Sequence, residues 1–311
     1  MTPNLVWLLA TVASFSSAQT PDVQWDGAVG GTVRDRIGDV SAAEIVLLVS
    51  GEQHGQLGDC GCPSRPLGGI ARVDGYAQAV QRKTDAPVLR INAGHAFDDT
   101  IGISGTLRDD VVATNALMAE ALGSWEMVNF GVTDIPWLDQ HPLSSSVSAT
   151  QIPTDGRPVH TVQTIEVDGE TVALIGLSGP GLAFLPPKHH QEVRVMDGLH
   201  AALAQTDAQT VVVVGIDLGD ALLQVAAHPR VDLLVTAGRV QERWAPERLG
   251  TAVWVRSIDD GQVLTDIRLT LDGGLASVVV RSIDLDSRLP EVRETRRLAD
   301  REAEIRARGL P

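Results

Sequence analysis

The fold is decided by residues 44–99, which read EIVLLVSGEQHGQLGDCGCPSRPLGGIARVDGYAQAVQRKTDAPVLRINAGHAFDD. The stretch begins with the apolar run Ile45 to Val49, which is too short for a membrane helix and rich in β-branched residues, so it predicts a buried strand. Ser50-Gly51 ends this strand, and a Pro-Leu-Gly-Gly turn leads into a helical segment, Ile70 to Lys83. A second buried strand, Pro87 to Ile91, follows. The pattern predicts two neighbouring strands joined by a helix.

Side chains that can bind a metal or move a proton follow both strands. Glu52, His54, Cys60 and Cys62 come after the first strand, and His95 comes after the second. In an α/β sheet, ligands bind just beyond the carboxyl ends of the strands. We therefore expect a functional site at this edge of the sheet.

The remainder of the chain continues the alternation of strands and helices. Helical spacing or strand-like apolar runs occur in the following segments: 107–122, 127–130, 159–167, 171–177, 195–204, 211–214, 219–227, 231–235, 252–258, 264–271 and 276–283. The order is βαβα followed by hairpins, with Asp168-Gly169 and Asp272-Gly273-Gly274 as turns. This pattern predicts an α/β protein in which two mixed sheets pack together and helices flank them, an αββα sandwich.

The sequence divides into four parts. Residues 1–18 carry no charge and include an apolar segment followed by small residues, which predicts a signal peptide and a periplasmic or secreted protein; an uncleaved anchor is the alternative. Residues 19–43 are polar and predict a linker, and residues 44–287 hold the predicted domain. Residues 288–311 contain seven Arg and five acidic residues, which predicts a charged C-terminal helix that is solvated or packed at an edge.

Charge and composition exclude several classes of partner. The net charge of −15 and the pI near 4.8 argue against duplex nucleic acid or an anionic membrane surface. No C-x-x-C-H motif occurs, which excludes covalent haem. After removal of the leader, the chain has no transmembrane helix in its sequence pattern. The partner, either a small molecule or a protein, is not identified by the sequence.

Three motifs resemble the 5′-nucleotidase/UshA-like branch of the calcineurin-like metallophosphoesterases. That family reads strand–N-D-x-H-G, then L-G-G-x-A-R, then strand–D-x-G-D-x-F. The matching segments here are Ser50 to Gly55, Leu67 to Arg72 and Asn92 to Phe97. The resemblance implies the same αββα architecture and a centre that holds two divalent metal ions, with Zn, Mn and Mg as candidates.

The resemblance also places the metal ligands, and few of them are present. Glu52 stands at the position of the first Asp, His54 matches, and His95 replaces the bridging Asp. Further expected ligand positions lack a ligand. They read Gly131-Val132-Thr133-Asp134, Gly215-Ile216-Asp217 and Ala237-Gly238-Arg239-Val240. Losing several ligands removes much of the metal affinity, so the resemblance implies an eroded dimetal centre formed by Glu52, His54 and His95.

Four other residues are candidate ligand contacts at the strand ends. Asp98 can bind a cation or act as a turn acid, and Asp134 can instead accept a backbone N–H at a helix start. Asp217 follows an apolar strand, and Arg239 can pair with a phosphate or carboxylate or form an ordinary salt bridge.

Cys60 and Cys62 are the only cysteines of the chain. Three readings remain open for them: a structural disulfide, a labile redox pair, and a mononuclear zinc or copper site shared with His54, His95 and Glu52. The segment C-G-C-P…P-L-G-G-x-A-R is also similar to a UshA-like branch whose members can carry selenocysteine, which favours thiol chemistry. We therefore expect an exported binding or thiol-redox protein, with a residual phosphoesterase and a structural partner protein as alternatives.

Overall fold

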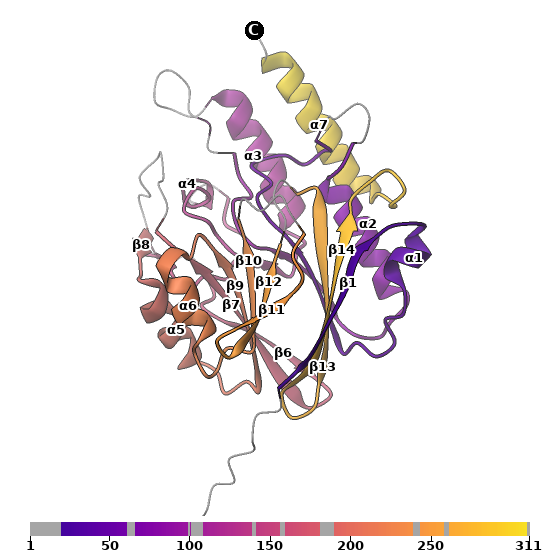
Figure 1. The fold of residues 1–311 in the computed structure, drawn as a ribbon. Coiled ribbons are helices and arrows are strands. Elements are labelled where there is room, and N and C mark those ends of the chain that lie inside the picture. Colours follow the sequence, from indigo (N-terminus) through magenta and orange to yellow (C-terminus); the bar gives the residue numbers. More distant parts are fainter. Residues whose placement is uncertain are drawn as a thin grey trace, which may run out of the picture.

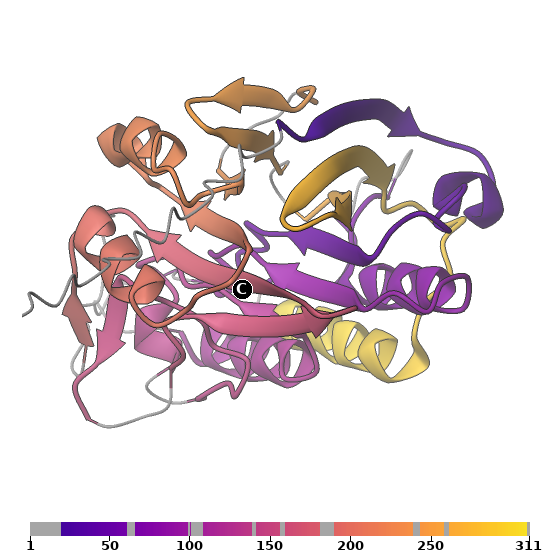
Figure 2. The same cartoon turned by 90° about the horizontal axis from the view of Figure 1, so that it is seen from below.

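The computed structural model describes residues 20–60, 66–98, 100, 108–138, 141–155, 159–180, 190–238, 243–257 and 261–309. Two mixed sheets pack face to face, and helices cover their outer faces (Figures 1 and 2). Three apolar cores separate these layers: one lies between the sheets, and one lies between each sheet and its helices. The predicted αββα sandwich is confirmed.

The first sheet has six strands in the order β1-β14-β13-β2-β3-β4. Their bounds are β1 Asp22–Val29, β14 Leu275–Asp284, β13 Val263–Leu271, β2 Ile45–Ser50, β3 Val88–Asn92 and β4 Met127–Val128. In β2, Ile45 and Leu47 face the second sheet while Val46 packs toward the helices. Because both faces of β2 are covered, its sequence is continuously apolar rather than alternating.

The second sheet also has six strands, in the order β11-β12-β10-β9-β7-β6. Their bounds are β11 Glu247–Leu249, β12 Ala252–Arg256, β10 Leu233–Ala237, β9 Thr210–Ile216, β7 Glu170–Ser178 and β6 Gln163–Val167. Strands β7, β9, β10 and β12 are parallel, so their carboxyl ends share one edge. A separate two-stranded sheet pairs β5 Gln151–Pro153 with β8 His190–Glu192.

Helices complete the outer layers. The first sheet is covered by α2 Ile70–Gln81, α3 Asp109–Leu122 and α7 Arg293–Gly309. The second sheet is covered by α5 Val195–Leu203 and α6 Leu222–Ala226, the latter preceded by the 3₁₀ turn η1 Gly219–Ala221. A short helix, α4 Ile135–Leu138, follows the end of β4.

The prediction of a linker at residues 19–43 is wrong for most of its length. Strand β1 pairs in parallel with β14 at the edge of the first sheet, and α1 Val33–Ile37 follows with a capping box between Thr32 and Asp35. The guanidinium of Arg36 is fully buried and donates to Asp286 at 2.7 Å and to the carbonyl of Asp284 at 2.6 Å. These bonds fix α1 to the sheet, because a buried charge must be paired.

The C-terminal segment forms one long helix, α7, beside α2 and α3 (Figure 1). Its Leu298 and Ile305 pack on the core of the first sheet, so α7 is docked rather than solvated. The expected leader, residues 1–18, lies outside the described residues. Among the residues that are described, no helix has the length and apolar character needed to cross a membrane.

Candidate functional site

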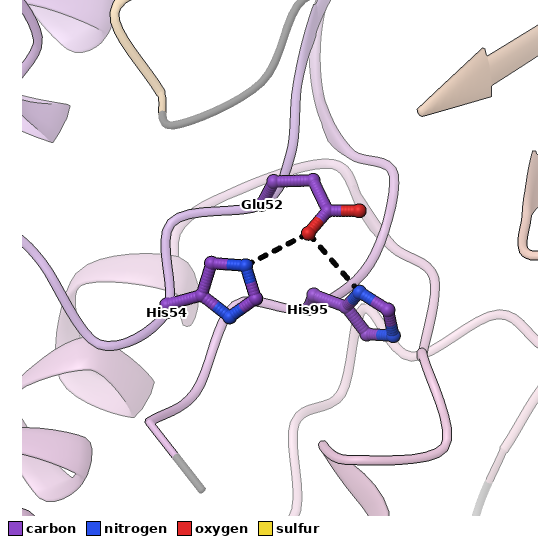
Figure 3. Close-up of side chains that lie close together, drawn as sticks. All are labelled: Glu52, His54 and His95. Carbon is purple, nitrogen blue, oxygen red and sulfur yellow. Dashed lines mark hydrogen bonds and ion pairs between the residues drawn. The ribbon is translucent and has the colours of Figure 1, made fainter. Parts of the chain in front are cut away.

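Three side chains of the predicted site meet beyond the carboxyl ends of β2 and β3. Glu52 and His54 follow β2, and His95 follows β3, whose pairing with β2 is parallel. Glu52 Oε2 lies 2.8 Å from His54 Nε2 and 3.1 Å from His95 Nδ1, so one carboxylate oxygen holds both imidazoles (Figure 3). Glu52, His54 and His95, which the sequence analysis gives as candidate metal ligands, therefore lie together at this edge of the sheet.

The backbone at this cluster is held in the left-handed region. The φ angles are 57° at Glu52, 47° at His54 and 54° at His95, and 51° at Asp217 beyond β9. Non-glycine residues rarely adopt this region, and each such residue costs about 1–3 kcal/mol that the surroundings must offset. Four strained residues at one edge of the sandwich indicate that the loops are shaped to aim these side chains at one point.

The end of β4 supports the site instead of supplying ligands. The fully buried carboxylate of Asp134 accepts the backbone N–H groups of His95 at 2.7 Å, Gly131 at 2.8 Å and Phe97 at 3.0 Å. It thus bonds backbone N–H groups, as expected, but in the strand-end loops and not at a helix start. The Cα of Gly131 packs on the His95 ring, where a Cβ would lie 1.9 Å from His95 Cδ2.

A second support, Asn129, joins the two sheets below the site. Its side-chain amide Nδ2 lies 3.0 Å from the carbonyl oxygen of Ala93, 3.1 Å from that of Leu177 and 3.3 Å from that of Val214. These carbonyls belong to the ends of β3, β7 and β9, so one buried amide fixes three strand ends together. No sequence motif marks Asn129, so its role was not predictable from the sequence.

Electrostatics give the cluster a charged character. Burial alone raises the pKa of Glu52, but the hydrogen bonds from His54 and His95 outweigh it and lower the pKa to about 2. Burial likewise opposes charge on His95, yet Asp217 and Glu52 raise its pKa to about 10. The hydrogen bond to Glu52 also raises the pKa of His54. Burial raises the pKa of Asp134. Without a cation, His95 is therefore protonated near neutral pH, and the raised pKa of His54 favours its protonated form as well.

Of the other candidate contacts, one lies at the cluster, one lies in a neighbouring loop, and two fall outside the described residues. Asp217 reaches the site: its Oδ2 lies 3.2 Å from His95 Nε2, close enough for an ion pair but outside hydrogen-bond geometry. Asp98 stabilises the backbone that follows β3: its Oδ1 accepts the N–H of Thr100, and its Oδ2 lies 3.5 Å from Arg306. Arg239 and Cys62 lie outside the described residues.

Cys60 lies beside the cluster, and backbone bonds join it and Asp59 to the residues just before α2. Its N–H donates to the carbonyl of Leu67 at 2.7 Å, and Asp59 forms a β-bridge with Gly68. The guanidinium of Arg72 donates to the carbonyl of Gly68 at 2.9 Å and pairs with Asp59 at 3.4 Å. Arg72, the arginine of the L-G-G-x-A-R motif, thus bonds both partners of this bridge.

A cavity of about 500 Å³ opens between the cluster and α7. Glu52, His54 and Cys60 line one wall, and residues of α7, including Arg296, Asp300, Glu302 and Arg306, line the other. The helix that the sequence predicts only as a charged tail is therefore part of the site.

The donor set could hold a metal ion. Glu52, His54 and His95 each offer a ligand atom, and these atoms lie within 4.8 Å of one another. At the neighbouring strand ends, Val132 is a buried apolar side chain and Gly238 has no side chain, so neither supplies a ligand for a second ion. A cation bound at the three donors would act as a Lewis acid on an oxygen or sulfur atom of its ligand.

The fold is like that of solved 5′-nucleotidases and related enzymes. The chain superposes on a 5′-nucleotidase precursor from Thermus thermophilus with a TM-score of 0.65 at 18% identity, covering 85% of this chain and 59% of that one. For the sulfate thiohydrolase SoxB of Thermus thermophilus, the TM-score is 0.63 at 13% identity, with 86% and 62% covered. For the NAD nucleotidase of Haemophilus influenzae, the TM-score is 0.60 at 17% identity, covering 86% of this chain and 60% of that one.

These likenesses establish the fold. The chain spans about three fifths of the length of these solved structures. No protein-family model matches the chain, and no curated protein matches it in sequence.

Proposed function

We propose that this chain is a metallophosphoesterase-fold protein in which the two-metal centre is eroded to a site for one divalent cation. One observation carries the proposal: Glu52, His54 and His95 converge with three ligand atoms within 4.8 Å of one another, while Val132 and Gly238 stand where the resemblance places further ligands. Two imidazoles and one carboxylate suit Zn²⁺, whereas Mg²⁺ prefers oxygen ligands alone. Zinc is therefore the cation proposed, ahead of manganese and magnesium.

A single cation favours ligand binding over phosphoryl hydrolysis. In a two-metal site, the ions clamp both the attacking and the leaving oxygen, and one ion cannot do both. Val132 and Thr133 also replace the Asn ligand and the catalytic His that the resemblance implies. The residues of this chain would hold the cation at the floor of the cavity beside α7 and leave its open side to a small-molecule ligand.

Elemental analysis and Zn²⁺ titration calorimetry of the purified chain test the proposal. We expect close to one Zn²⁺ per chain, and we expect His54→Ala and Glu52→Gln to lose most of this binding. His160→Ala is the matched control, because His160 is exposed and its side chain has no role in the cluster. Wild-type protein that binds no divalent cation, or binds it equally well after His54→Ala, contradicts the proposal.

A residual phosphoesterase is the competing function at the same residues. The test is hydrolysis of nucleoside monophosphates and p-nitrophenyl phosphate with added Zn²⁺, Mn²⁺ or Mg²⁺, for which we expect near-background rates. Turnover of roughly 1 s⁻¹ or more, within the ordinary enzyme range and abolished by His54→Ala, would show that an active hydrolytic centre remains.

A thiol-redox role is the second candidate, and the observation that favours it is that Cys60 lines the same cavity as His54. In such a role, the thiolate of one cysteine attacks a partner disulfide and releases one partner thiolate. The second cysteine then resolves the mixed disulfide, so two electrons pass from Cys60 and Cys62 to the partner. Mild reduction of the native protein, alkylation and mass spectrometry test this role. Thiols that react only after denaturation favour a structural disulfide.

We also propose export, on the basis of the uncharged apolar leader. Terminal sequencing of the mature protein should begin near Gln19, and an intact Met1 on a protein in the cytoplasm refutes the proposal. If the purified chain binds no metal, hydrolyses no ester and has no reactive thiol, a structural partner role is left.

A further inference from the structure

Helix α7 makes direct hydrogen bonds to the loop that carries His54. Glu302 is almost completely buried, and its Oε2 accepts the N–H groups of Leu57 at 3.0 Å and Gly58 at 3.1 Å. Arg306 donates through Nη2 to the carbonyl of Gly55 at 3.1 Å and through Nε to Glu302 Oε1 at 2.6 Å. A buried carboxylate needs such partners, since an unpaired one is strongly disfavoured.

The loop needs support because its backbone is strained. His54 has a φ of 47°, and a residue in this region persists only where its surroundings over-determine its conformation. The β3 side supplies two bonds: His54 N–H donates to the carbonyl of His95 at 3.0 Å, and Gly55 N–H donates to that of Ala96 at 2.7 Å. From the other side, the N–H of Ile70 donates to the carbonyl of Leu57 at 3.0 Å. The side chains that bond the backbone of residues 55–58 from α7 are those of Glu302 and Arg306.

We propose that Glu302 and Arg306 are positioning residues that hold His54 in its ligand conformation, so that the cation affinity of the site depends on the seating of α7. This inference rests on the cation site proposed above. The two side chains bond the backbone within four residues of the proposed ligand and line the cavity that leads to it. A helix that only stabilised the fold would use its apolar side, where Leu298 and Ile305 already pack on the core.

Zn²⁺ titration of the full chain, at a temperature well below each variant's unfolding midpoint, tests the proposal. Glu302→Ala should weaken Zn²⁺ binding about 10- to 100-fold, the usual loss when a group that orients a metal ligand is removed. Glu302→Gln keeps an oxygen that can accept the N–H groups of Leu57 and Gly58, so we expect it to retain most of the affinity. Arg306→Ala should show an intermediate loss.

The chain offers a matched control on the same helix. Glu304 and Arg308 form an ion pair of the same spacing at 3.5 Å, with 66% and 81% of their side chains exposed, so Glu304→Ala should leave Zn²⁺ affinity unchanged. Leu203→Ala in α5 controls for lost stability, because it creates a cavity in the core on the outer face of the second sheet. Affinity that falls equally in Leu203→Ala and Glu302→Ala reports instability and overturns the proposal.

The outcomes separate the two proposals. Wild-type protein that binds no Zn²⁺ contradicts the cation site itself. Wild-type protein that binds Zn²⁺, together with Glu302→Ala and Arg306→Ala variants of unchanged affinity, contradicts only the role of α7. If Glu302→Ala does not fold, Arg306→Ala and Glu302→Gln decide the matter, because unchanged affinity in Arg306→Ala refutes the role of the pair.

Discussion

Replacing Asp134 by Ala should destabilise the protein severely, because the Asp134 side chain is fully buried and hydrogen-bonded. Its carboxylate accepts three backbone N–H groups, from His95, Gly131 and Phe97. Each buried donor left without a partner costs about 1–3 kcal/mol, so the three together cost about 3–9 kcal/mol. Removal of a buried charge offsets part of this loss, and we expect a decrease of about 4 kcal/mol in the free energy of unfolding.

Asp134→Asn separates the geometry from the charge. Oδ2 of Asp134 serves two of the three donors and Oδ1 serves the third. An asparagine oriented with its oxygen at the Oδ2 position keeps two bonds and turns its own N–H toward the third donor. We therefore expect Asn to cost about 2 kcal/mol, roughly half the cost of Ala.

Urea denaturation followed by circular dichroism measures both effects, with an unchanged m-value as the check that the unfolded state is the same. Asp39→Ala is the control: Asp39 also accepts a backbone N–H, from Ser41 at 2.9 Å, but it is exposed, and we expect no measurable loss. If Asp134→Ala is as stable as Asp39→Ala, the reasoning that Asp134 fixes the site loops is wrong.

Three further perturbations test the site and its supports. Gly131→Ala places a Cβ 1.9 Å from the neighbouring histidine ring. We therefore expect the free energy of unfolding in urea to fall by about 2 kcal/mol through overpacking, and Zn²⁺ binding to weaken at least tenfold. Gly30→Ala is the control and should change neither quantity, because nothing lies within 4 Å of a Cβ at that position. Asn129→Asp should be less stable than Asn129→Ala in the same assay, because a carboxylate would face three carbonyl oxygens where Ala only removes their donor. Although burial opposes it, hydrogen bonds from two arginines lower the pKa of Asp286. Its stabilising effect is therefore full above about pH 4 and is lost as the pH falls toward its folded pKa. Asp286→Asn should cost about 2 kcal/mol at pH 7, less than usual for a stranded buried charge because Arg36 keeps its carbonyl partners, and should flatten the loss of stability in acid.

Much of the sandwich could be predicted because its central strands are buried on both faces. Such strands are continuous apolar runs, and the predicted runs at residues 45–49 and 211–214 are found within β2 and β9. Strand β1 escaped prediction because it lies at an edge, where only Val23, Trp25 and alternate residues after them are half-buried. The capping box of Thr32 and Asp35 is the signal that could have revealed the helix that follows β1.

The ligand-type residues of the site were predictable, whereas their supports were not. Glu52, His54 and His95 follow recognisable strands, so topology alone brings them to one edge. Asp134, Asn129 and Glu302 act by bonding backbone groups of distant segments. A bond to a backbone group requires no particular partner residue, so it leaves no pattern in the sequence.

Charge balance shows why the cluster of Glu52, His54 and His95 suits one divalent cation. In the cluster, the carboxylates of Glu52 and Asp217 face the imidazoles of His54 and His95. With both imidazoles protonated these four groups carry no net charge, and with both neutral and one divalent cation bound they again carry none. Zn²⁺ can therefore replace two protons without a change in the net charge of these four groups, whereas a second dication would add two further positive charges. Because the pKa of His95 is about 10 and hydrogen bonding to Glu52 raises the pKa of His54, Zn²⁺ uptake at pH 7 should release more than one proton and strengthen as the pH rises. Calorimetry in buffers of different ionisation enthalpy counts these protons, and binding without proton release would place the cation on other ligands.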